Sequence, residues 1–478
     1  MAQKPNLLFV FSDQHRFRDL GCYGNTQVHS PCLDAFAGES LRFAHCVSNV
    51  PVCVPMRGSM LTGRMPLGHG ALTNDFAIRP ETPSIATVLN EAGYHTGYIG
   101  KWHLGGIPRD KFIPAEERLG FTEWKAAECN HSYNNDYYDD ENDVRHPIEG
   151  YDAVTQTDLA IDFMKRNKSA KPWAAVLSWG PPHDPYDQCP PEDRALYNPD
   201  ELVLPPNVRF PVQVSPKFQR DEWQLREALA GYYGHITALD RQFGRLVDTL
   251  KATGQWENTV VVYTSDHGDM LGSHGVSNKQ FAYDESMLVP LMVHGPGVRW
   301  GVTQEMISLV DLPVTLMGLL GLHFQTEVEG LNLAALFGND TLKGPDVSYA
   351  CVQLPCHQAF GPNQYAWRAV RSSRFTYCLA MTPEGVDADE YSFLFDNEKD
   401  PWQMNNCLHT PAYAEVKAVL HERLMTLCKQ YDAPLPWEDF ARHFGYVLQW
   451  NLSQRHFRLE PLDDTGADID ISQIPARW

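Results

Sequence analysis

Long apolar runs are absent from this sequence of 478 residues. No segment approaches the roughly 18 uninterrupted apolar residues of a transmembrane helix, so we expect no membrane span. A signal peptide is not recognisable either, because Met1-Ala2-Gln3-Lys4-Pro5 leads directly into the short apolar run from Asn6 to Phe11 without a cleavage site. The expected location is therefore cytoplasmic, or periplasmic or secreted if a signal has been trimmed.

Positive charge is scarce. The chain has 39 Lys and Arg against 60 Asp and Glu, a formal net charge of -21. Nucleic-acid binding needs a basic surface, so this balance argues against that class of partner. An anionic substrate would be repelled by the field of the whole protein, and its binding would depend on local cations.

Closely spaced cysteine pairs are also lacking. The 11 cysteines are scattered, with no C-x-x-C pair and no small-domain disulfide framework. We expect most of them to be buried, reduced thiols, which fits a reducing compartment.

Residues 1 to 345 alternate apolar runs with amphipathic helical patterns, which is typical of an α/β domain whose mainly parallel sheet is flanked by helices. The clearest buried strands are predicted at Asn6 to Phe11, Trp173 to Trp179 and Thr259 to Thr264. Helical spacing predicts one helix opening at Thr82-Pro83 and stopping at Gly93, and a long one from Asp221 to Thr253.

Residues 346 to 478 form the second predicted unit, a small C-terminal α+β domain. We expect an antiparallel sheet from Tyr365 to Arg371, Arg374 to Leu379 and Phe393 to Asp396, a helix from Ala412 to Gln430, and a tail. Between the strands of the first unit, Asn134 to Asp143 is predicted to be a polar, acidic loop rich in tyrosine.

The motif with the most chemical content is Cys53-Val54-Pro55-Met56-Arg57, followed by Thr62-Gly63-Arg64. A cysteine nucleophile needs a base nearby, yet no histidine is adjacent to Cys53 in the sequence. The motif alone therefore leaves the chemistry of Cys53 open.

Acidic and polar residues follow two of the predicted strands, in Ser12-Asp13-Gln14-His15 and in Ser265-Asp266-His267-Gly268-Asp269. Ligands of open α/β sheets bind outside the carboxyl ends of strands. Carboxylate and amide oxygens suit a hard cation, and imidazole suits zinc or other transition metals. Asp13, Gln14, Asp266 and His267 are thus a candidate metal cage around Cys53, although the first segment alone also fits a capped turn.

Three further segments supply candidate proton-transfer and anion-binding groups. Gly100-Lys101-Trp102-His103 would place Lys101 and His103 on one side if it is extended. Prolines on both sides would hold His183 in a rigid loop, and histidine titrates near neutrality. Lys279 follows the Asp266 segment, and by itself it would be read as a surface lysine.

Together these residues resemble the sulfatase family of the alkaline-phosphatase-like superfamily, from the first strand to the C-terminal sheet. The resemblance is specific at Cys53 to Arg64, where it carries the C-x-P-x-R signature. It implies that Cys53 is converted to formylglycine by a formylglycine-generating or sulfatase-maturing enzyme. It also implies that Asp13, Gln14, Asp266 and His267 bind a divalent metal together with the modified Cys53.

The resemblance assigns the remaining roles as well. Arg57 would hold the formylglycine. The sulfate would be bound by Lys101, His183 and Lys279. The leaving alcohol would receive its proton from His183 or Lys279. His103 would then release sulfate from a covalent sulfo-enzyme. Asp13-Gln14 and Asp266-His267 depart from the commoner Asp-Asp and Asp-Asn pairs, which weakens the assignment of calcium. Calcium is still the first expectation, and manganese, zinc and magnesium stay open.

Several alternatives remain at this stage. Phosphonate monoester or phosphodiester hydrolases share C-x-P-x-R and the Asp-Gln pair, but Lys101 with His103 favours sulfate. An unconverted Cys53 would leave a non-catalytic binder of sulfated ligands. The expected substrate is a sulfated carbohydrate, with an aryl or alkyl sulfate as the alternative, and the oligomeric state is open. Candidate substrate-binding residues are His131, Tyr133, His357 and Gln364.

Overall fold

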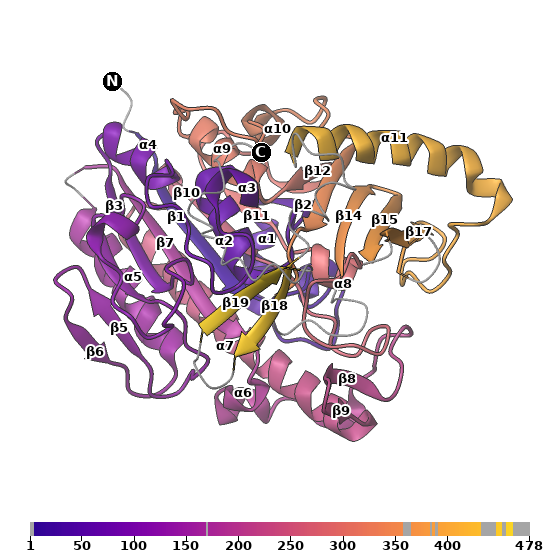
Figure 1. Ribbon diagram of the computed structural model, residues 1–478. Helices are drawn as coiled ribbons and strands as arrows, with labels where there is room; N and C mark the ends of the chain where they lie inside the picture. Colours follow the sequence, from indigo (N-terminus) through magenta and orange to yellow (C-terminus); the bar gives the residue numbers. More distant parts are fainter. Residues whose placement is uncertain are drawn as a thin grey trace.

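The computed structural model describes residues 4–168, 171–356, 365–382, 385–387, 391–431, 446–451 and 456–461. Its largest element is a mixed sheet of 10 strands, most of whose central neighbours are parallel (Figure 1). In spatial order the strands are β12 Gly301–Ser308, β2 Leu41–Val47, β11 Met292–His294, β10 Thr259–Ser265, β1 Asn6–Asp13, β7 Trp173–Pro182, β3 His95–Lys101, β4 Glu123–Ala127, β5 Tyr137–Asp140 and β6 Arg145–Pro147. The predicted α/β fold with a mainly parallel sheet is confirmed.

Alternate residues of β1 enter two different cores, because successive side chains of a strand point to opposite faces. Leu7, Phe9 and Phe11 pack on one face, and Leu8 and Val10 on the other. The first face is covered by α2 Cys53–Thr62, α4 Ile85–Glu91, α9 Asp311–Leu319 and α10 Ala334–Gly338. The second is covered by α1 Pro31–Gly38, α5 Asp152–Asn167 and α7 Glu222–Ala252.

Short elements complete the large unit. They are the helices α3 Pro66–His69, α6 Pro191–Arg194 and α8 Asp284–Met287, and the hairpin of β8 Val212–Ser215 with β9 Phe218–Arg220. This hairpin runs directly into α7 (Figure 1).

A second, antiparallel sheet lies near the C-terminus, as expected from the sequence. It contains β13 Val347–Val352, β14 Ala366–Ser372, β15 Phe375–Thr382, β16 Gly385–Asp387 and β17 Phe393–Asp396. Leu420 and Leu424 of α11 Ala414–Tyr431 pack in the core of this sheet, which also receives Val50 and Met287 from the large unit. A further strand pair is formed by β18 Tyr446–Asn451 and β19 His456–Pro461. The division of the chain at residue 345 stays a prediction.

Two predictions of local structure were wrong. The helix expected at Thr82 begins at Ile85, because Ser84 is the residue whose hydroxyl accepts hydrogen bonds from the nitrogens of Ala86 and Thr87. The loop expected from Asn134 to Asp143 contains strand β5, whose residues pair with both β4 and β6. Its two adjacent tyrosines, Tyr137 and Tyr138, favour a strand.

The long helix α7 confirms the prediction for residues 221 to 253. Asp221 caps its first turn, accepting a hydrogen bond from Gln224 N at 2.9 Å. The eleven cysteines are all free thiols. No helix in the described part of the chain has the length and apolar character of a bilayer span.

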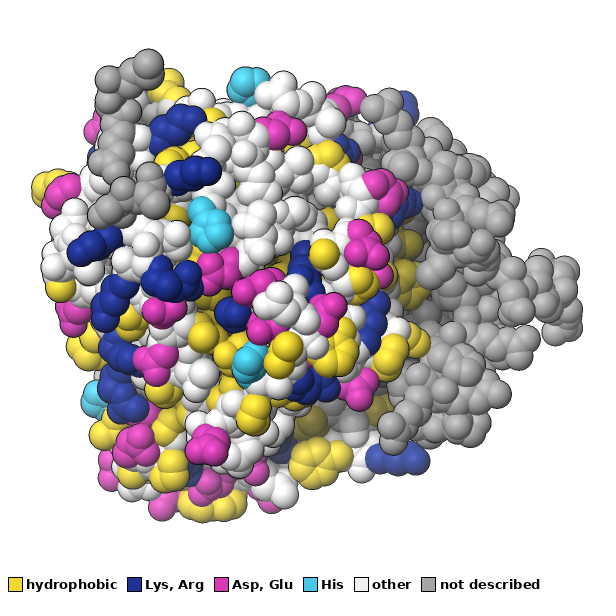
Figure 2. Space-filling model, turned by 90° about the vertical axis from the view of Figure 1, so that its left-hand side faces the viewer, with side chains coloured by type: hydrophobic (Ala, Val, Ile, Leu, Met, Phe, Trp, Pro, Cys, Tyr) yellow, Lys and Arg dark blue, Asp and Glu magenta, His cyan; other side chains and the backbone are white. Residues whose placement is uncertain are grey.

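Acidic, basic and apolar side chains are interspersed on the face that Figure 2 shows. Lys and Arg side chains form a run along the left side of this view, although the chain as a whole has a net charge of -21.

Candidate active site

Helix α2 carries Cys53 and Arg57 into the interior. The helix begins at Cys53, and all ten of its residues are buried. Residues four positions apart lie on the same side of a helix, so Arg57 lies one turn below Cys53. The helix N-terminus adds partial positive charge beside the cysteine.

The Arg57 guanidinium joins α2 to three strands of the large sheet. It forms ion pairs with Asp13 Oδ2 and Asp266 Oδ2, both at 3.0 Å, and it donates to Ser178 Oγ at 2.7 Å. The two carboxylates come together because β1 and β10 are parallel neighbours with Ser12 opposite Ser265. As the sequence predicts, Asp13 and Asp266 therefore lie at the carboxyl ends of their strands, where ligands of open α/β sheets bind.

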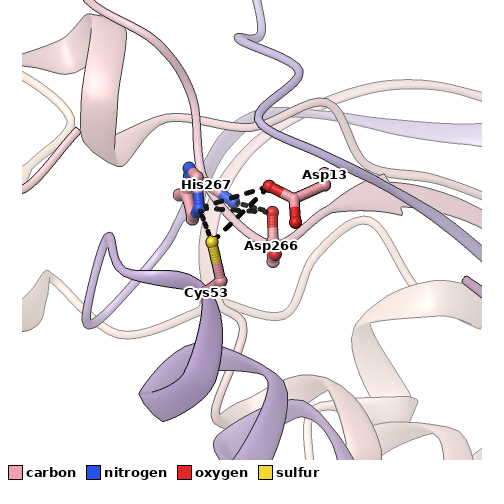
Figure 3. A group of neighbouring side chains, drawn as sticks. All are labelled: Asp13, Cys53, Asp266 and His267. Carbon is pink, nitrogen blue, oxygen red and sulfur yellow. Dashed lines mark hydrogen bonds and ion pairs between the residues drawn. The ribbon is translucent and has the colours of Figure 1, made fainter. Parts of the chain in front are cut away.

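Four buried side chains point toward one another at this place, as Figure 3 shows. One ligand atom from each of Asp13, Cys53, Asp266 and His267 lies within 4.8 Å of the others. Cys53 Sγ lies 3.1 Å from His267 Nε2 and 3.7 Å from Asp13 Oδ1. Two carboxylates and an imidazole around one point are a donor set that fits a divalent cation.

Gln14 lies against this group through its backbone. It adopts a left-handed conformation with φ of 68°, and its nitrogen donates to Asp266 Oδ1 at 3.1 Å. Its side-chain oxygen accepts from Lys279 Nζ at 2.7 Å, and its side-chain nitrogen donates to Asp269 Oδ2 at 2.7 Å. A carbonyl oxygen has a second lone pair, so Gln14 retains one position for a metal.

Lys101 lies on the opposite side of Asp13 from the metal-facing oxygen. Its ammonium forms an ion pair with Asp13 Oδ2 at 2.7 Å and lies 3.4 Å from His131 Nε2. Burial opposes the charge of Lys101, but the carboxylate of Asp13 outweighs burial and raises its pKa. Lys101 is therefore a permanent cation of the site.

His103 does not continue the strand, so the condition under which Lys101 and His103 would share one side is not met. Strand β3 ends at Lys101, and His103 has a φ of 56°, in the left-handed region. Both ring nitrogens are buried and have no hydrogen-bond partner in the described part of the chain. Burial and the charges of Lys101 and Arg109 hold its pKa well below the usual range, so its ring is neutral and can accept a proton.

His183 and Lys279 meet at the end of β7. Lys279 Nζ lies 2.6 Å from His183 Nε2, and His183 Nδ1 lies 2.7 Å from the carbonyl oxygen of Asp184. Burial and the charge of Lys279 lower the pKa of His183 well below its usual range. Lys279 is 2% exposed, so its interpretation as a surface lysine is excluded.

The charge balance of the pocket favours anions. Burial raises the pKa of Asp13, but the charges of Lys101, His183 and Arg57 lower it. The result is a pKa well below the ordinary value of an aspartate. Burial and Asp13 oppose ionisation of the Cys53 thiol, but Lys279, His267 and Lys101 outweigh them and lower its pKa. These local cations overcome the repulsion that the acidic chain exerts on an anionic substrate.

The four candidate substrate-binding residues have different outcomes. His131 belongs to the site, because its ring stacks on that of His183 with centroids 4.4 Å apart. The structure places Tyr133 in the interior instead of at a pocket rim. It is 1% exposed, and its hydroxyl lies 3.3 Å from the carbonyl oxygen of Gly180. His357 and Gln364 lie outside the described residues.

Sequence reasoning missed three polar groups that support the site. Ser178 of β7 accepts a hydrogen bond from Arg57, and Tyr186 donates to Asp269 Oδ2. Asp269 in turn holds the side chain of Gln14. The position of Asp269, three residues after Asp266, was an available signal, whereas Ser178 and Tyr186 have no signal in the sequence.

Comparison with known families confirms the resemblance. The Sulfatase family model matches residues 5–322, and the model for the C-terminal region of N-sulphoglucosamine sulphohydrolase matches residues 272–430. The chain belongs to the sulfatase family. It is therefore a sulfatase, an enzyme that acts on sulfate esters.

Individual relatives match over most of their length. An ulvan-active sulfatase of Formosa agariphila is 37% identical to this sulfatase over 462 residues, covering 94% of the chain and 86% of the relative. Among solved structures, the Bacteroides thetaiotaomicron protein BT33494S-sulf is 27% identical, with a TM-score of 0.81 and coverage of 92% and 98%. A phosphonate monoester hydrolase of Silicibacter pomeroyi shares the fold, at 22% identity, a TM-score of 0.73 and coverage of 96% and 100%.

Proposed function

We propose that this sulfatase removes sulfate from a sulfated carbohydrate, with Cys53 converted to formylglycine by a maturing enzyme. The observation that carries the proposal is the position of Cys53 at the start of α2, where His267 Nε2 lies 3.1 Å from its Sγ. Lys101 and Lys279 are close enough to lower its pKa. Hydrated formylglycine supplies a hydroxyl nucleophile at the place of this sulfur.

Asp13, Gln14, Asp266 and His267 are the residues that would hold a divalent cation, for which calcium is our first choice. Such a cation supplies positive charge that activates the nucleophile and neutralises sulfate oxygens. Arg57 holds Asp13 and Asp266 through one carboxylate oxygen each. Asp13 Oδ1 is thereby left facing Cys53, at 3.7 Å from Sγ.

Lys101, Lys279 and His183 would bind the sulfate group. In the unconverted chain burial would lower the pKa of Lys279, but Cys53 and Asp13 raise it. Asp13 is still present after Cys53 is converted, and the ammonium is expected to keep its proton at neutral pH. His183 is neutral and accepts the hydrogen bond from Lys279. The pair therefore holds one proton that can pass to the oxygen of the leaving alcohol, which is general acid catalysis.

His103 would act as the base that completes turnover. Its neutral ring, with both nitrogens unpartnered among the described residues, is able to remove a proton from the modified Cys53 side chain. A buried polar atom without a partner costs free energy, and the cost is removed when a ligand supplies the missing hydrogen bond.

The carbohydrate half of the proposal rests on two observations. One relative is named as an ulvan-active sulfatase, and a solved neighbour comes from work on the metabolism of glycosaminoglycans. Next to the sulfate-binding groups, His131 offers a polar aromatic ring stacked on His183. A polar ring in this position is able to contact a sugar hydroxyl or ring face.

The test has two parts. Peptide mass spectrometry is expected to find formylglycine at position 53 in active protein, and an unmodified thiol in active protein would refute this mechanism. Turnover is then compared on sulfated mono- and disaccharides, aryl sulfates and a phosphonate monoester. We expect a sugar sulfate to give the highest kcat/KM. Preference for the phosphonate would favour the hydrolase alternative, and failure on every sugar sulfate would remove the carbohydrate proposal.

A further inference from the structure

The β8–β9 hairpin is joined by backbone hydrogen bonds to the loop that carries Lys279. Gln213 N donates to the carbonyl oxygen of Gly275 at 2.8 Å, and Ser277 N donates to the carbonyl oxygen of Gln213 at 3.0 Å. Ser277 is only two residues before Lys279. The hairpin is thus held in a fixed relation to one side of the catalytic pocket.

Arg220, the last residue of this hairpin, lies on the flank of the site. Its guanidinium carbon is 5.6 Å from the centre of the Tyr186 ring, and the Tyr186 hydroxyl donates to Asp269, which holds Gln14. Asp184, the residue after His183, is also near enough for the charge of Arg220 to affect it. The pKa of Asp184 is raised by burial, against which Lys279 and Arg220 act. The ring contact with Tyr186 and the charge effect on Asp184 therefore place Arg220 on the side of the site where His183 lies.

Arg220 has no anionic partner in the described part of the chain. It is half-buried, with no carboxylate within 4.0 Å and no hydrogen-bond acceptor. Three arginines of α6 and α7 are, by contrast, paired: Arg226 with Glu222, Arg194 with Glu227 and Arg241 with Asp193. In a protein of net charge -21, an arginine beside the active site that no acid neutralises leaves five N–H donors for a ligand.

Aromatic surface accompanies this cation. The Phe218 ring, 46% exposed, lies 5.9 Å from the guanidinium carbon of Arg220. Trp223, at the start of α7, is 50% exposed. Exposed aromatic rings next to hydrogen-bond donors combine an apolar face with polar recognition, which suits a sugar ring that bears a charged substituent.

We propose that Arg220 and Phe218 form a second subsite, which binds an anionic group on the sugar unit next to the one that loses sulfate. The anion is a carboxylate or a second sulfate, since both match the planar fork of arginine. This inference rests on the proposed carbohydrate function and specifies it further: the substrate is an acidic saccharide of at least two units.

The test compares Arg220→Met with Arg245→Met, a matched control. Arg245 lies on α7 and pairs with Asp158 at the surface, so its replacement changes the net charge equally without touching the proposed subsite. The substrates are two sulfated disaccharides that differ only in the neighbouring unit, a uronate in one and a neutral hexose in the other.

For Arg220→Met we expect KM on the uronate disaccharide to rise about 10- to 100-fold, as for a lost hydrogen bond to a charged group, with kcat unchanged. KM on the neutral disaccharide, and both KM values of Arg245→Met, are expected to stay within about twofold of the parent. Calorimetry with the desulfated uronate disaccharide is expected to show the same loss of affinity without requiring turnover.

An equal rise of KM on both disaccharides would overturn the subsite. A changed pH profile of kcat at unchanged KM would also overturn it, because Arg220 would then act through Asp184 and His183. The carbohydrate function itself would be refuted if the enzyme hydrolysed aryl sulfates but neither hydrolysed nor bound either disaccharide. These outcomes separate failure of the subsite from failure of the proposed function.

Discussion

The ammonium nitrogen of Lys279 lies 2.6 Å from Nε2 of His183, and both residues are buried. We predict that Lys279→Met and His183→Ala lower kcat on a sugar sulfate by about 10²- to 10⁴-fold, the usual contribution of a general acid. Because 4-nitrophenolate leaves without a proton, the loss on 4-nitrophenyl sulfate is expected to be much smaller. Steady-state kinetics on both substrates measure the difference, and equal losses would show that the pair only binds sulfate.

Arg57 is the counter-charge of two buried carboxylates. Removing one partner of a buried ion pair costs about 3–5 kcal/mol, so Arg57→Met is expected to lower the free energy of unfolding by that amount in metal-free protein. Urea denaturation measures the change. Arg245→Met, at an exposed pair, serves as the control and is expected to cost less than about 1 kcal/mol. Similar values for both variants would contradict the central position of Arg57.

The parts of the site that the sequence reveals are those whose signals are local. Asp13 and Asp266 each follow an apolar strand, and parallel pairing of the two strands brings them together. Lys279 has no such signal, because it is buried by contacts with residues such as Gln14, 265 positions away. The same limit applies to Ser178, whose contact with Arg57 depends on how α2 crosses the end of β7.

Local backbone conformation was harder to predict than the positions of the buried strands. Alternation of side chains would place Lys101 and His103 on one side only in an extended segment, but His103 turns into the left-handed region just after the strand. Non-glycine residues in this region are sparse and concentrate at functional sites. Gln14 has the same property, so two of the residues closest to the chemistry are those whose backbone a propensity scale describes least well.

Metal removal is expected to abolish activity. Chelation followed by elemental analysis should yield inactive protein, and we expect calcium to restore more activity than magnesium, manganese or zinc. His267→Ala is expected to lower the metal content, whereas His294→Ala is the control, since His294 stacks on Trp256 at a distance from the site. Full activity in protein shown to be metal-free would exclude the metal from the mechanism.

Glu128 predicts a specific dependence of stability on pH. Burial raises its pKa to about 7, while the nitrogen of Gly105, which donates to both carboxylate oxygens at 3.0 Å, acts in the opposite direction. The folded state therefore binds the proton more tightly than the unfolded state. The stabilisation from this group is complete below the ordinary pKa of 4.5 and is lost as pH rises through 7.

The loss between these limits is on the order of 3 kcal/mol. Urea denaturation of the parent and of Glu128→Gln across this range gives the comparison. The substitution also changes the absolute stability, so the quantity compared is the slope of the unfolding free energy against pH. We expect the parent to lose more stability than the variant as pH rises, and identical slopes would show that Glu128 does not titrate in this range.

Trp367 connects the C-terminal sheet to the loop of Lys279. Its indole nitrogen donates to the carbonyl oxygen of Gln280 at 2.7 Å, and Gln280, with a φ of 80°, accepts at its side-chain oxygen from Cys356 N at 2.8 Å. Trp367→Phe keeps an aromatic side chain, although a smaller one, and removes this donor, and the lost hydrogen bond is expected to cost about 1–3 kcal/mol. Because Lys279 is the neighbour of Gln280, we also expect kcat to fall more on a sugar sulfate than on 4-nitrophenyl sulfate.

Trp300→Phe is the matched control, since Trp300 is 77% exposed and belongs neither to the Lys279 loop nor to the proposed subsite. Thermal unfolding and kinetics on the two substrates measure both effects. A loss of stability without any dependence on the leaving group would mean that Trp367 supports the fold alone. A loss of stability together with a larger fall of kcat on the sugar sulfate than on 4-nitrophenyl sulfate would show that the C-terminal sheet positions the proton donor of the active site.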